Sequence, residues 1–138
     1  MKQRTYVMLK PDACERRLIG KIITKIEEKG FSITNMKMMN LNEKILREHY
    51  SHLTDKPFFP ELVEFMVDGP SIGMIVEGDD VVNGMRILMG PTKWPEALPG
   101  TIRGDFASNI TRNLIHGSDS VENAEIEIKR FFNEVNPI

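Results

Sequence analysis

Short apolar runs and polar segments follow one another along the chain. Four of the apolar runs have the length and composition of buried strands, and they cover residues 5–9, 31–39, 71–77 and 113–115. In the second run the alternation slips near Asn35, which predicts a β-bulge there. Apolar residues at helical spacing predict amphipathic helices: one with Leu18, Ile19, Ile22, Ile23 and Ile26 that ends at Gly30, then 43–53 and 61–67, one with Val82, Met85 and Met89 that ends at Gly90, and 121–132.

Acidic residues stand where several of these helices should begin. Asp12 with Glu15 and Asp119 with Glu122 have the capping-box spacing, and the adjacent acids at 79 and 80 can cap the helix that ends at Gly90. The last helix is expected to bury one apolar stripe, made of Val121, Ala124, Ile128, Phe131 and Phe132.

The order of elements is β-α-β-(α-α)-β-α-β-α. It predicts an α+β fold, a ferredoxin-like βαββαβ core whose four-stranded antiparallel sheet is covered by helices, with the helices expected on one face. Residues 90–104 form a long irregular stretch with three prolines, Pro91, Pro95 and Pro99. A loop of that length inside a compact domain is usually functional.

Length, charge and cysteine content narrow the protein class. A chain of 138 residues supports one domain, residues 1–138. Its 18 basic and 20 acidic residues give a net charge of −2, which disfavours a surface for nucleic acid. The single cysteine, Cys14, excludes an internal disulfide. The polar, basic start of the chain shows no signal peptide, and no apolar run is long enough to span a membrane, so we expect a cytoplasmic protein.

His116 is the first candidate for chemistry. It ends an apolar stretch and precedes a helix start that is rich in Ser and Asp, where backbone N–H groups and the helix dipole favour a phosphoryl group. Gly117 beside it permits close approach of backbone or ligand. Glu127, at the edge of the apolar stripe of the last helix, can face inward and orient the imidazole. The alternative is an incidental histidine in a capping segment, and the residues alone favour that alternative.

Three other groups suggest ligand contacts. Lys10, Arg86, Thr92 and Arg103 lie at loop or terminal positions and could converge on a polyphosphate, although scattered solvated charge is an equally good interpretation. In residues 57–60, one of two aromatic rings between prolines could stack on a base, unless both rings fill the core. His49 and His52 are spaced i, i+3, but they lack a carboxylate or cysteine at ligand spacing, so a structural metal is not expected. The chain contains no Walker-type or protein-kinase glycine loop and no GxGxxG, so phosphate transfer here would need another device, such as a histidine relay.

Several longer segments carry a resemblance to a known family. They are TYVMLKPD at 5–12, HY at 49–50, KPFFP at 56–60, LVEFM at 62–66, GP at 69–70, PGTIRGDF at 99–106 and NLIHGSDS at 113–120. In this order they resemble the nucleoside diphosphate kinase family over nearly the whole chain. The resemblance implies a ping-pong reaction with broad base specificity, in which a triphosphate such as ATP phosphorylates His116 and a nucleoside diphosphate then collects the group.

The resemblance also implies a role for each matching residue. His116 would be the nucleophile, supported by Glu127 and Ser118. Phosphate contacts and charge stabilisation would come from Lys10, Tyr50, Arg86, Thr92 and Arg103, and ribose contacts from Lys10 and Asn113. Phe58 would stack on the base, with Ile110 on its other side. Mg²⁺ would arrive with the nucleotide, held mainly by its phosphates and with few or no protein ligands.

The resemblance implies a homo-oligomer as well, with a hexamer favoured over a tetramer. The apolar Ile126, off the main stripe of its helix, hints at a second buried face. Two departures from the family pattern stand out. Ala13 replaces a common glycine, which disfavours positive φ in that turn. Trp94 replaces a small polar residue in a loop that lies near subunit contacts in family members, so it bears on assembly.

Two other functions predict different sequences. A catalytically silent protein on the same scaffold predicts the loss of one of His116, Arg103, Asn113 or Lys10, and all four are present. A nucleic-acid-binding module predicts basic charge and aromatics spaced along central strands. The chain instead is net acidic, with Tyr6 in the first strand and Phe31 opening the second, so this function ranks last.

Overall fold

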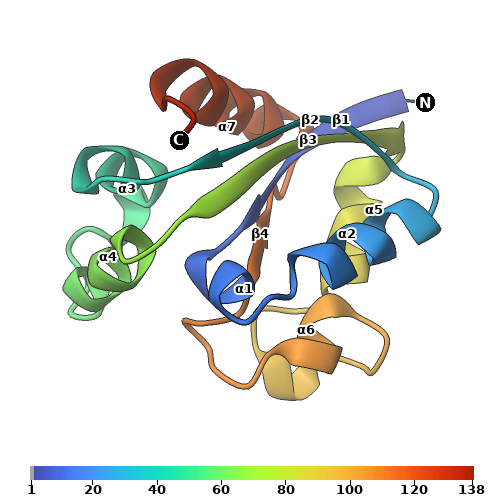
Figure 1. The fold of residues 1–138 in the computed structure, drawn as a ribbon, viewed down its shortest axis with the longest axis horizontal. Helices are drawn as coiled ribbons and strands as arrows, with labels where there is room; N and C mark the ends of the chain where they lie inside the picture. The colour runs from blue at the N-terminus through green and yellow to red at the C-terminus, as the bar shows by residue number, and fades with distance from the viewer. Residues whose placement is uncertain (1) are drawn as a thin grey trace.

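A four-stranded antiparallel sheet forms the centre of the molecule in the computed structural model, which describes residues 2–138. The strands are β1 (Lys2–Leu9), β2 (Ser32–Met39), β3 (Ser71–Asp79) and β4 (Ile115–Gly117). They lie in the order β2-β3-β1-β4, and each pairs antiparallel with its neighbours (Figure 1). This is the predicted ferredoxin-like α+β arrangement. The predicted bulge is confirmed as well, since the register of β2 on β3 shifts between Ile33 and Asn35.

Seven α-helices and two 3₁₀ turns connect and cover the strands among the residues that the structure describes. The helices are α1 (Pro11–Glu15), α2 (Ile19–Glu28), α3 (Glu43–His49), α4 (Phe59–Val67), α5 (Val81–Met89), α6 (Ile102–Phe106) and α7 (Val121–Glu134), and the turns are η1 (Ser51–Leu53) and η2 (Trp94–Glu96). The helix predicted over 43–53 is therefore two elements, and the stretch 90–104 holds a short turn and the start of α6.

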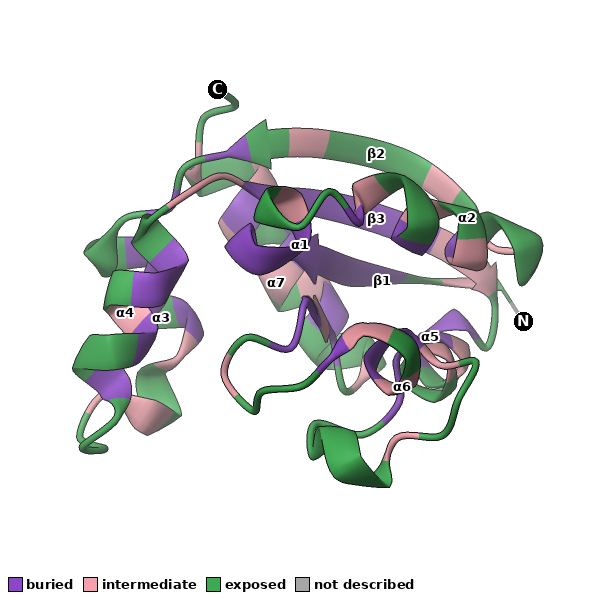
Figure 2. Cartoon of the chain, turned by 60° about the horizontal axis from the view of Figure 1, so that its bottom comes forward, coloured by how far each residue is buried: buried purple, intermediate pink, exposed green. Residues whose placement is uncertain are grey.

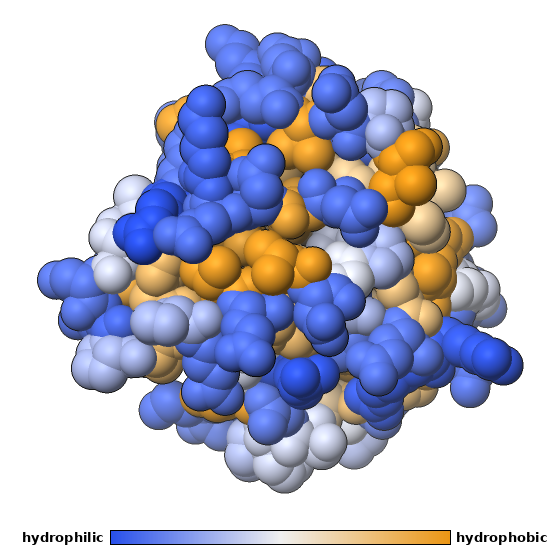
Figure 3. Space-filling model, turned by 60° about the vertical axis from the view of Figure 1, so that its left-hand side comes forward, coloured by the Kyte–Doolittle hydropathy of each residue, from blue (hydrophilic) through white to orange (hydrophobic). Residues whose placement is uncertain are grey.

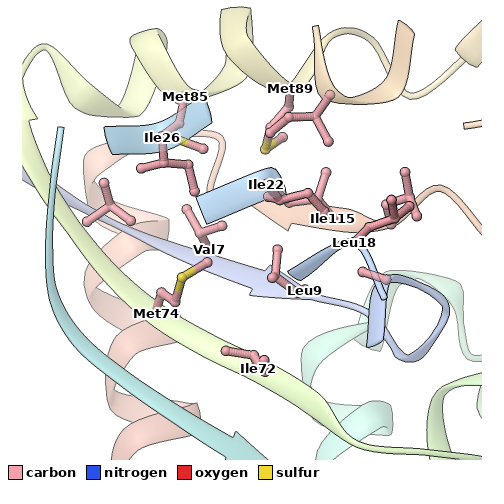
Figure 4. Packing of buried hydrophobic residues seen from close by; sticks show 14 of the residues in the cluster. Val7, Leu9, Leu18, Ile22, Ile26, Ile72, Met74, Met85, Met89 and Ile115 are labelled. Atoms are coloured by element: carbon pink, nitrogen blue, oxygen red, sulfur yellow. The ribbon is translucent and has the colours of Figure 1, made fainter. Parts of the chain in front are cut away.

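Helices cover both faces of the sheet, not one. Alternate residues of a strand point to opposite faces. Val7 and Leu9 of β1 therefore pack with α2 and α5 in one core (Figure 4). Tyr6 and Met8 pack with α3, α4 and α7 in a second core. Because β1 is buried on both sides, its apolar run is continuous, while the edge strand β2 is largely exposed (Figure 2).

The predicted helix caps are the main local errors. The N-cap of α1 is Lys10, and the Asp12 carboxylate instead accepts the backbone N–H of Leu114 at 3.1 Å. Ser120 caps α7 by accepting the N–H of Asn123, one residue beyond the predicted Asp119. Asp80 precedes α5 in a left-handed conformation and makes no side-chain cap. In each case a long-range contact or a neighbouring side chain displaces the local capping pattern.

The burial of α7 also differs from the prediction at its first turn. Ala124, Ile128 and Phe131 are buried as expected, but Val121 is 45% exposed. Ile126, which hinted at a second buried face, is 52% exposed in this chain.

Two positions singled out in the sequence are now placed. Ala13 lies inside α1 and is fully buried in the first core, so the position does not require the positive φ that a glycine would allow. Trp94 opens η2 and is 37% exposed.

The surface is mostly polar. Figure 3 shows the side of the molecule at the left of Figure 1, where hydrophilic side chains surround a hydrophobic zone. Over residues 2–138, none of the helices combines the length and apolar character that crossing a bilayer requires.

Candidate active site

A cleft of about 940 Å³ lies between the end of α3, the C-terminal end of α5, the loop that follows α5, and α7. Its walls include six of the residues that the sequence nominates: Tyr50, Arg86, Thr92, Arg103, His116 and Glu127. Residues that are up to 77 positions apart in the sequence therefore meet in one concave site. A pocket of this size suits a small-molecule ligand.

The sheet register sets the direction of His116. In β4 it pairs with Met8 of β1, and directly opposed residues of an antiparallel pair share a face. His116 therefore points to the face that α7 covers. Its neighbour Gly117 faces the other core, where an added Cβ would lie 2.7 Å from the sulfur of Met89. Gly117 thus leaves room for the end of the Met89 side chain of α5, which a larger residue would have to displace.

A carboxylate holds one nitrogen of the His116 ring. His116 Nε2 lies 2.8 Å from Glu127 Oε1, and the Ser118 hydroxyl donates to the same oxygen at 2.6 Å. Burial would raise the pKa of Glu127, but the hydrogen bonds from His116 and Ser118 outweigh it and lower that pKa. An ionised carboxylate can only accept, so a neutral His116 carries its proton on Nε2. The lone pair then lies on Nδ1.

Lys10 and Asn113 form a buried pair beside this site. Lys10 follows β1, and its Nζ donates to Asn113 Oδ1 at 2.8 Å. Only 8% of Lys10 and 2% of Asn113 is exposed. Burial, and secondly the charge of Arg103, lowers the pKa of Lys10 to about 8. A poorly solvated ammonium gains much by meeting an anion.

Arg103 is anchored through backbone carbonyls. Its Nη1 donates to Gly90 O at 2.9 Å and its Nη2 to Ile115 O at 2.6 Å. Burial, followed by repulsion from Arg86, lowers the Arg103 pKa to about 10, so the group stays charged at neutral pH. Arg86 and Thr92 are exposed on the cleft wall. The cleft thus presents the fixed guanidinium of Arg103 and the exposed one of Arg86, and Arg130 of α7 lines it as well.

Tyr50 supplies a hydroxyl at the end of α3. Burial, then the negative charge of Glu127, raises its pKa, so Tyr50 remains a neutral O–H donor throughout the physiological range.

Of the two aromatic rings between the prolines, one is exposed and one is buried, as the base-stacking prediction required. Phe58 is 50% exposed, whereas Phe59 is 2% exposed and packs in the second core. Ile110, the proposed partner of Phe58, is 60% exposed on the loop before β4. That loop lies against α4, because the Arg112 guanidinium lies 4.7 Å from the centre of the Phe65 ring. Phe58 and Ile110 thus come from adjacent segments.

Sequence reasoning missed the position of His49. The sequence paired it with His52, but His52 is exposed, and His49 is 7% exposed with its ring centre 4.7 Å from that of His116. One potential ligand atom from each of His49, His116 and Glu127 lies within 4.8 Å of the other two. The spacing of histidines on one helix could not reveal a neighbour on β4.

Comparison with known proteins gives consistent matches. The family model described as nucleoside diphosphate kinase matches residues 3–136. A nucleoside diphosphate kinase of Exiguobacterium sibiricum is 54% identical over 130 residues, 94% of each chain. That of Acetivibrio thermocellus is 47% identical over 133 residues, 96% of this chain and 98% of the other.

Solved structures agree with the fold. An apo nucleoside diphosphate kinase from Encephalitozoon cuniculi superposes with a TM-score of 0.92 at 46% identity, covering 99% of this chain and 93% of the other. The enzyme of Halobacterium salinarum, solved with CDP, gives a TM-score of 0.92 at 44% identity, covering 100% and 93%.

These matches agree on the class: the protein is a phosphotransferase. The chain belongs to the nucleoside diphosphate kinase family, and it transfers the γ-phosphate of a nucleoside triphosphate to a nucleoside diphosphate. It binds nucleotides, and enzymes of this family generally use a divalent metal.

Proposed function

We propose that the enzyme works by a ping-pong mechanism in which Nδ1 of His116 accepts and then donates the γ-phosphate, with ATP as a donor. The observation that carries this proposal is the bond between His116 Nε2 and Glu127, which leaves the Nδ1 lone pair for the substrate in a cleft lined by cations. Ser118 supports the nucleophile by orienting the Glu127 carboxylate.

The first half-reaction forms a bond between Nδ1 and the γ-phosphorus. The bond from that phosphorus to the β–γ bridging oxygen breaks, and the electron pair leaves with the nucleoside diphosphate. In the second half, a terminal β-phosphate oxygen of an acceptor diphosphate attacks the same phosphorus. The N–P bond then breaks, and its electron pair returns to Nδ1. Fixed positive charge and positioning lower the barrier in transfers of this kind.

Each remaining residue has a place in this scheme. Arg86 and Arg103 bind phosphate oxygens and stabilise the charge of the transferring group. Thr92 and the Tyr50 hydroxyl donate further hydrogen bonds to phosphates. Lys10 binds phosphate and ribose oxygens together with Asn113, whose amide oxygen Lys10 already contacts.

Phe58 and Ile110 hold the base between two exposed apolar surfaces. Stacking does not read base edges, so this contact supports a broad range of nucleotides.

The divalent ion is Mg²⁺ in this proposal, and it enters as part of the nucleotide substrate. Mg²⁺ prefers oxygen ligands and retains water. Among residues 2–138, His49, His116 and Glu127 form a cluster of potential metal ligands. The Glu127 carboxylate in it already accepts hydrogen bonds from His116 and Ser118. Asp119, on the cleft wall, accepts from Asn123 at 2.6 Å. The donor set therefore fits an ion that is held by nucleotide phosphates, where it neutralises their charge.

Intact mass after mixing with Mg-ATP tests the proposal. We expect one added phosphate that survives base, is lost in acid and transfers to GDP. His116→Ala should show none of this. A phosphorylated His116→Ala protein that still transfers to GDP would refute the assignment of the nucleophile.

We further propose that residues 1–138 act as one cytoplasmic domain in a homo-oligomer, a hexamer in preference to a tetramer. Large exposed apolar side chains support association, among them Met36, Met38, Ile87 and Leu98. Native mass spectrometry measures the subunit number directly, and a monomer at micromolar concentration would contradict the proposal.

A further inference from the structure

His49 is a buried titratable group that the scheme above does not use. Its imidazole ends α3 and stands almost perpendicular to the His116 ring, at 85° and 4.7 Å between ring centres. The Phe131 ring contacts another side of His49 at 4.9 Å and 77°. The His49 ring is therefore packed tightly between His116 and Phe131 of the second core.

Arg130 of α7 determines which nitrogen of the His49 ring carries the proton. Its Nη1 lies 2.9 Å from His49 Nδ1. A guanidinium can only donate, so Nδ1 must accept, and the proton of the neutral imidazole is on Nε2. Arg130 is well placed for this, since its side chain is 13% exposed and the Glu48 carboxylate lies 3.6 Å from its Nε.

We propose that His49 is a positioning residue for His116 and that Arg130 keeps His49 in its neutral Nε2–H form. The inference rests on the proposed role of His116 as phosphate acceptor. His116 is tethered at Nε2 by Glu127, and the His49 ring limits rotation about that tether. Nδ1 is thereby held toward the substrate.

A protonated His49 would upset the arrangement. Charged and titratable groups face it from several elements: Tyr50 and His52 after its own helix, Lys10 at the end of β1, His116 of β4, and Glu127 and Arg130 of α7. Glu48 lies behind Arg130. A His49 imidazolium would compete with the neutral His116 ring for the Glu127 carboxylate. Burial, then His116 and Arg130, holds the pKa of His49 well below its usual value. Without Arg130 that pKa moves up, so the damage falls on the acid side of the pH range.

A transition-metal site is the competing interpretation, since His49, His116 and Glu127 offer ligand atoms within 4.8 Å of one another. A metal needs an imidazole lone pair from each histidine. The Nδ1 lone pair of His49 already accepts from Arg130, and its Nε2 carries the proton. The nearby guanidinium also repels a second cation. These contacts favour positioning over metal binding.

The test measures the rate of phosphate incorporation from Mg-ATP between pH 5.5 and 8.5, by rapid quench and intact mass. In Arg130→Met we expect the ratio of the rate at pH 5.5 to the rate at pH 8 to fall below the wild-type ratio, because removing that positive charge raises the pKa of His49. Arg130→Lys, which can still donate to Nδ1, should restore most of the acid-side rate. The exposed neighbour Lys129→Met should match wild type.

His49→Phe keeps a ring but cannot titrate or accept. We expect a lower kcat at every pH, an ATP KM within about twofold of wild type, and no further acid-side loss when Arg130→Met is added. Superimposable pH profiles for wild type and Arg130→Met, or an acid-side loss that persists in the double variant, would overturn the proposal. So would calorimetric binding of Zn²⁺ that disappears in His49→Phe. If wild type gains no phosphate on His116, the proposed function itself fails.

Discussion

The pH dependence set by Lys10 is the sharpest quantitative consequence of the site. Lys10 is 8% exposed, and its pKa falls from 10.5 to about 8, chiefly through burial and secondly through Arg103. A drop of that size corresponds to roughly 3 kcal/mol of destabilisation while Lys10 is charged in the folded state. The apo enzyme thus carries this cost at neutral pH, and in the proposed scheme a bound phosphate relieves it.

The sign of the effect follows from proton binding. The folded pKa lies below the unfolded pKa, so both states hold the proton below pH 8 and the destabilisation is complete there. Between pH 8 and 10.5 the unfolded state binds more protons, and the contribution of Lys10 to stability rises with pH. Activity should move the other way, because phosphate binding needs the ammonium form. The free energy of unfolding should therefore rise, and the activity should fall, over the same range between pH 8 and 10.5.

Two measurements check this reasoning. The kcat/KM profile, which reports the free enzyme, should show an alkaline limb near pH 8 that moves to higher pH in kcat, because bound phosphates favour charged Lys10. Urea unfolding should show that the stability of wild type relative to Lys10→Met rises by up to roughly 3 kcal/mol from pH 7 to 10.5. Lys56→Met, at an exposed lysine, is the control. A constant difference between wild type and Lys10→Met across this range would refute the argument.

Three further substitutions test other parts of the site. Glu127→Gln removes the charged acceptor of His116, and we expect the rate of phosphorylation to fall roughly 10- to 150-fold, by rapid quench. Phe58→Ala should weaken nucleotide binding roughly 5- to 150-fold in calorimetry, with little change in stability, because that ring is half exposed. Gly104→Ala would place a Cβ 1.9 Å from the Leu98 carbonyl oxygen, so we expect about 1–3 kcal/mol of destabilisation in urea unfolding, and lower activity.

Each of these variants has a matched control. Glu125→Gln, on the same helix as Glu127, loses an exposed pair with Arg4 and should leave the rate unchanged. Phe59→Ala should cost about 3–5 kcal/mol in stability. Gly20→Ala meets no atom within 4 Å and should stabilise α2 by up to about 1 kcal/mol. An equal effect in variant and control would show that the site geometry is not the cause.

The sequence predicted what depends on period and local composition. Three features have a local pattern in the sequence, and the structure confirms each of them. They are the buried strand β1 with its continuous apolar run, the β-bulge near Asn35 of β2, and the inward-facing Glu127 at the edge of the apolar stripe of α7. The division between Phe58 and Phe59 could only be left open, because the pattern between two prolines does not say which ring meets the second core.

Long-range contacts explain what the sequence could not show. His49 sits on a helix with no local reason to face β4, and its partner Arg130 is 81 residues away. The acids at 12 and 119 carry capping-box spacing, but their carboxylates find other partners. A local pattern shows that a carboxylate could accept a hydrogen bond at a helix start. The tertiary fold determines which donor actually lies within hydrogen-bond distance of it.

Asp12 shows how such a contact reaches the chemistry. Leu114 is buried with φ +77°, a left-handed conformation that costs a bulky residue about 1–2 kcal/mol. The Asp12 carboxylate accepts the backbone N–H of Leu114 at 3.1 Å, and the backbone N–H of Lys10 donates to the Leu114 carbonyl at 2.9 Å. The reversal at Leu114 leads from Asn113, which contacts Lys10, into β4, where His116 pairs with Met8 of β1. In the proposed scheme Lys10 and Asn113 bind ribose and His116 is the nucleophile. The contact from Asp12 of the first helix, 102 residues before Leu114, fixes the turn between them.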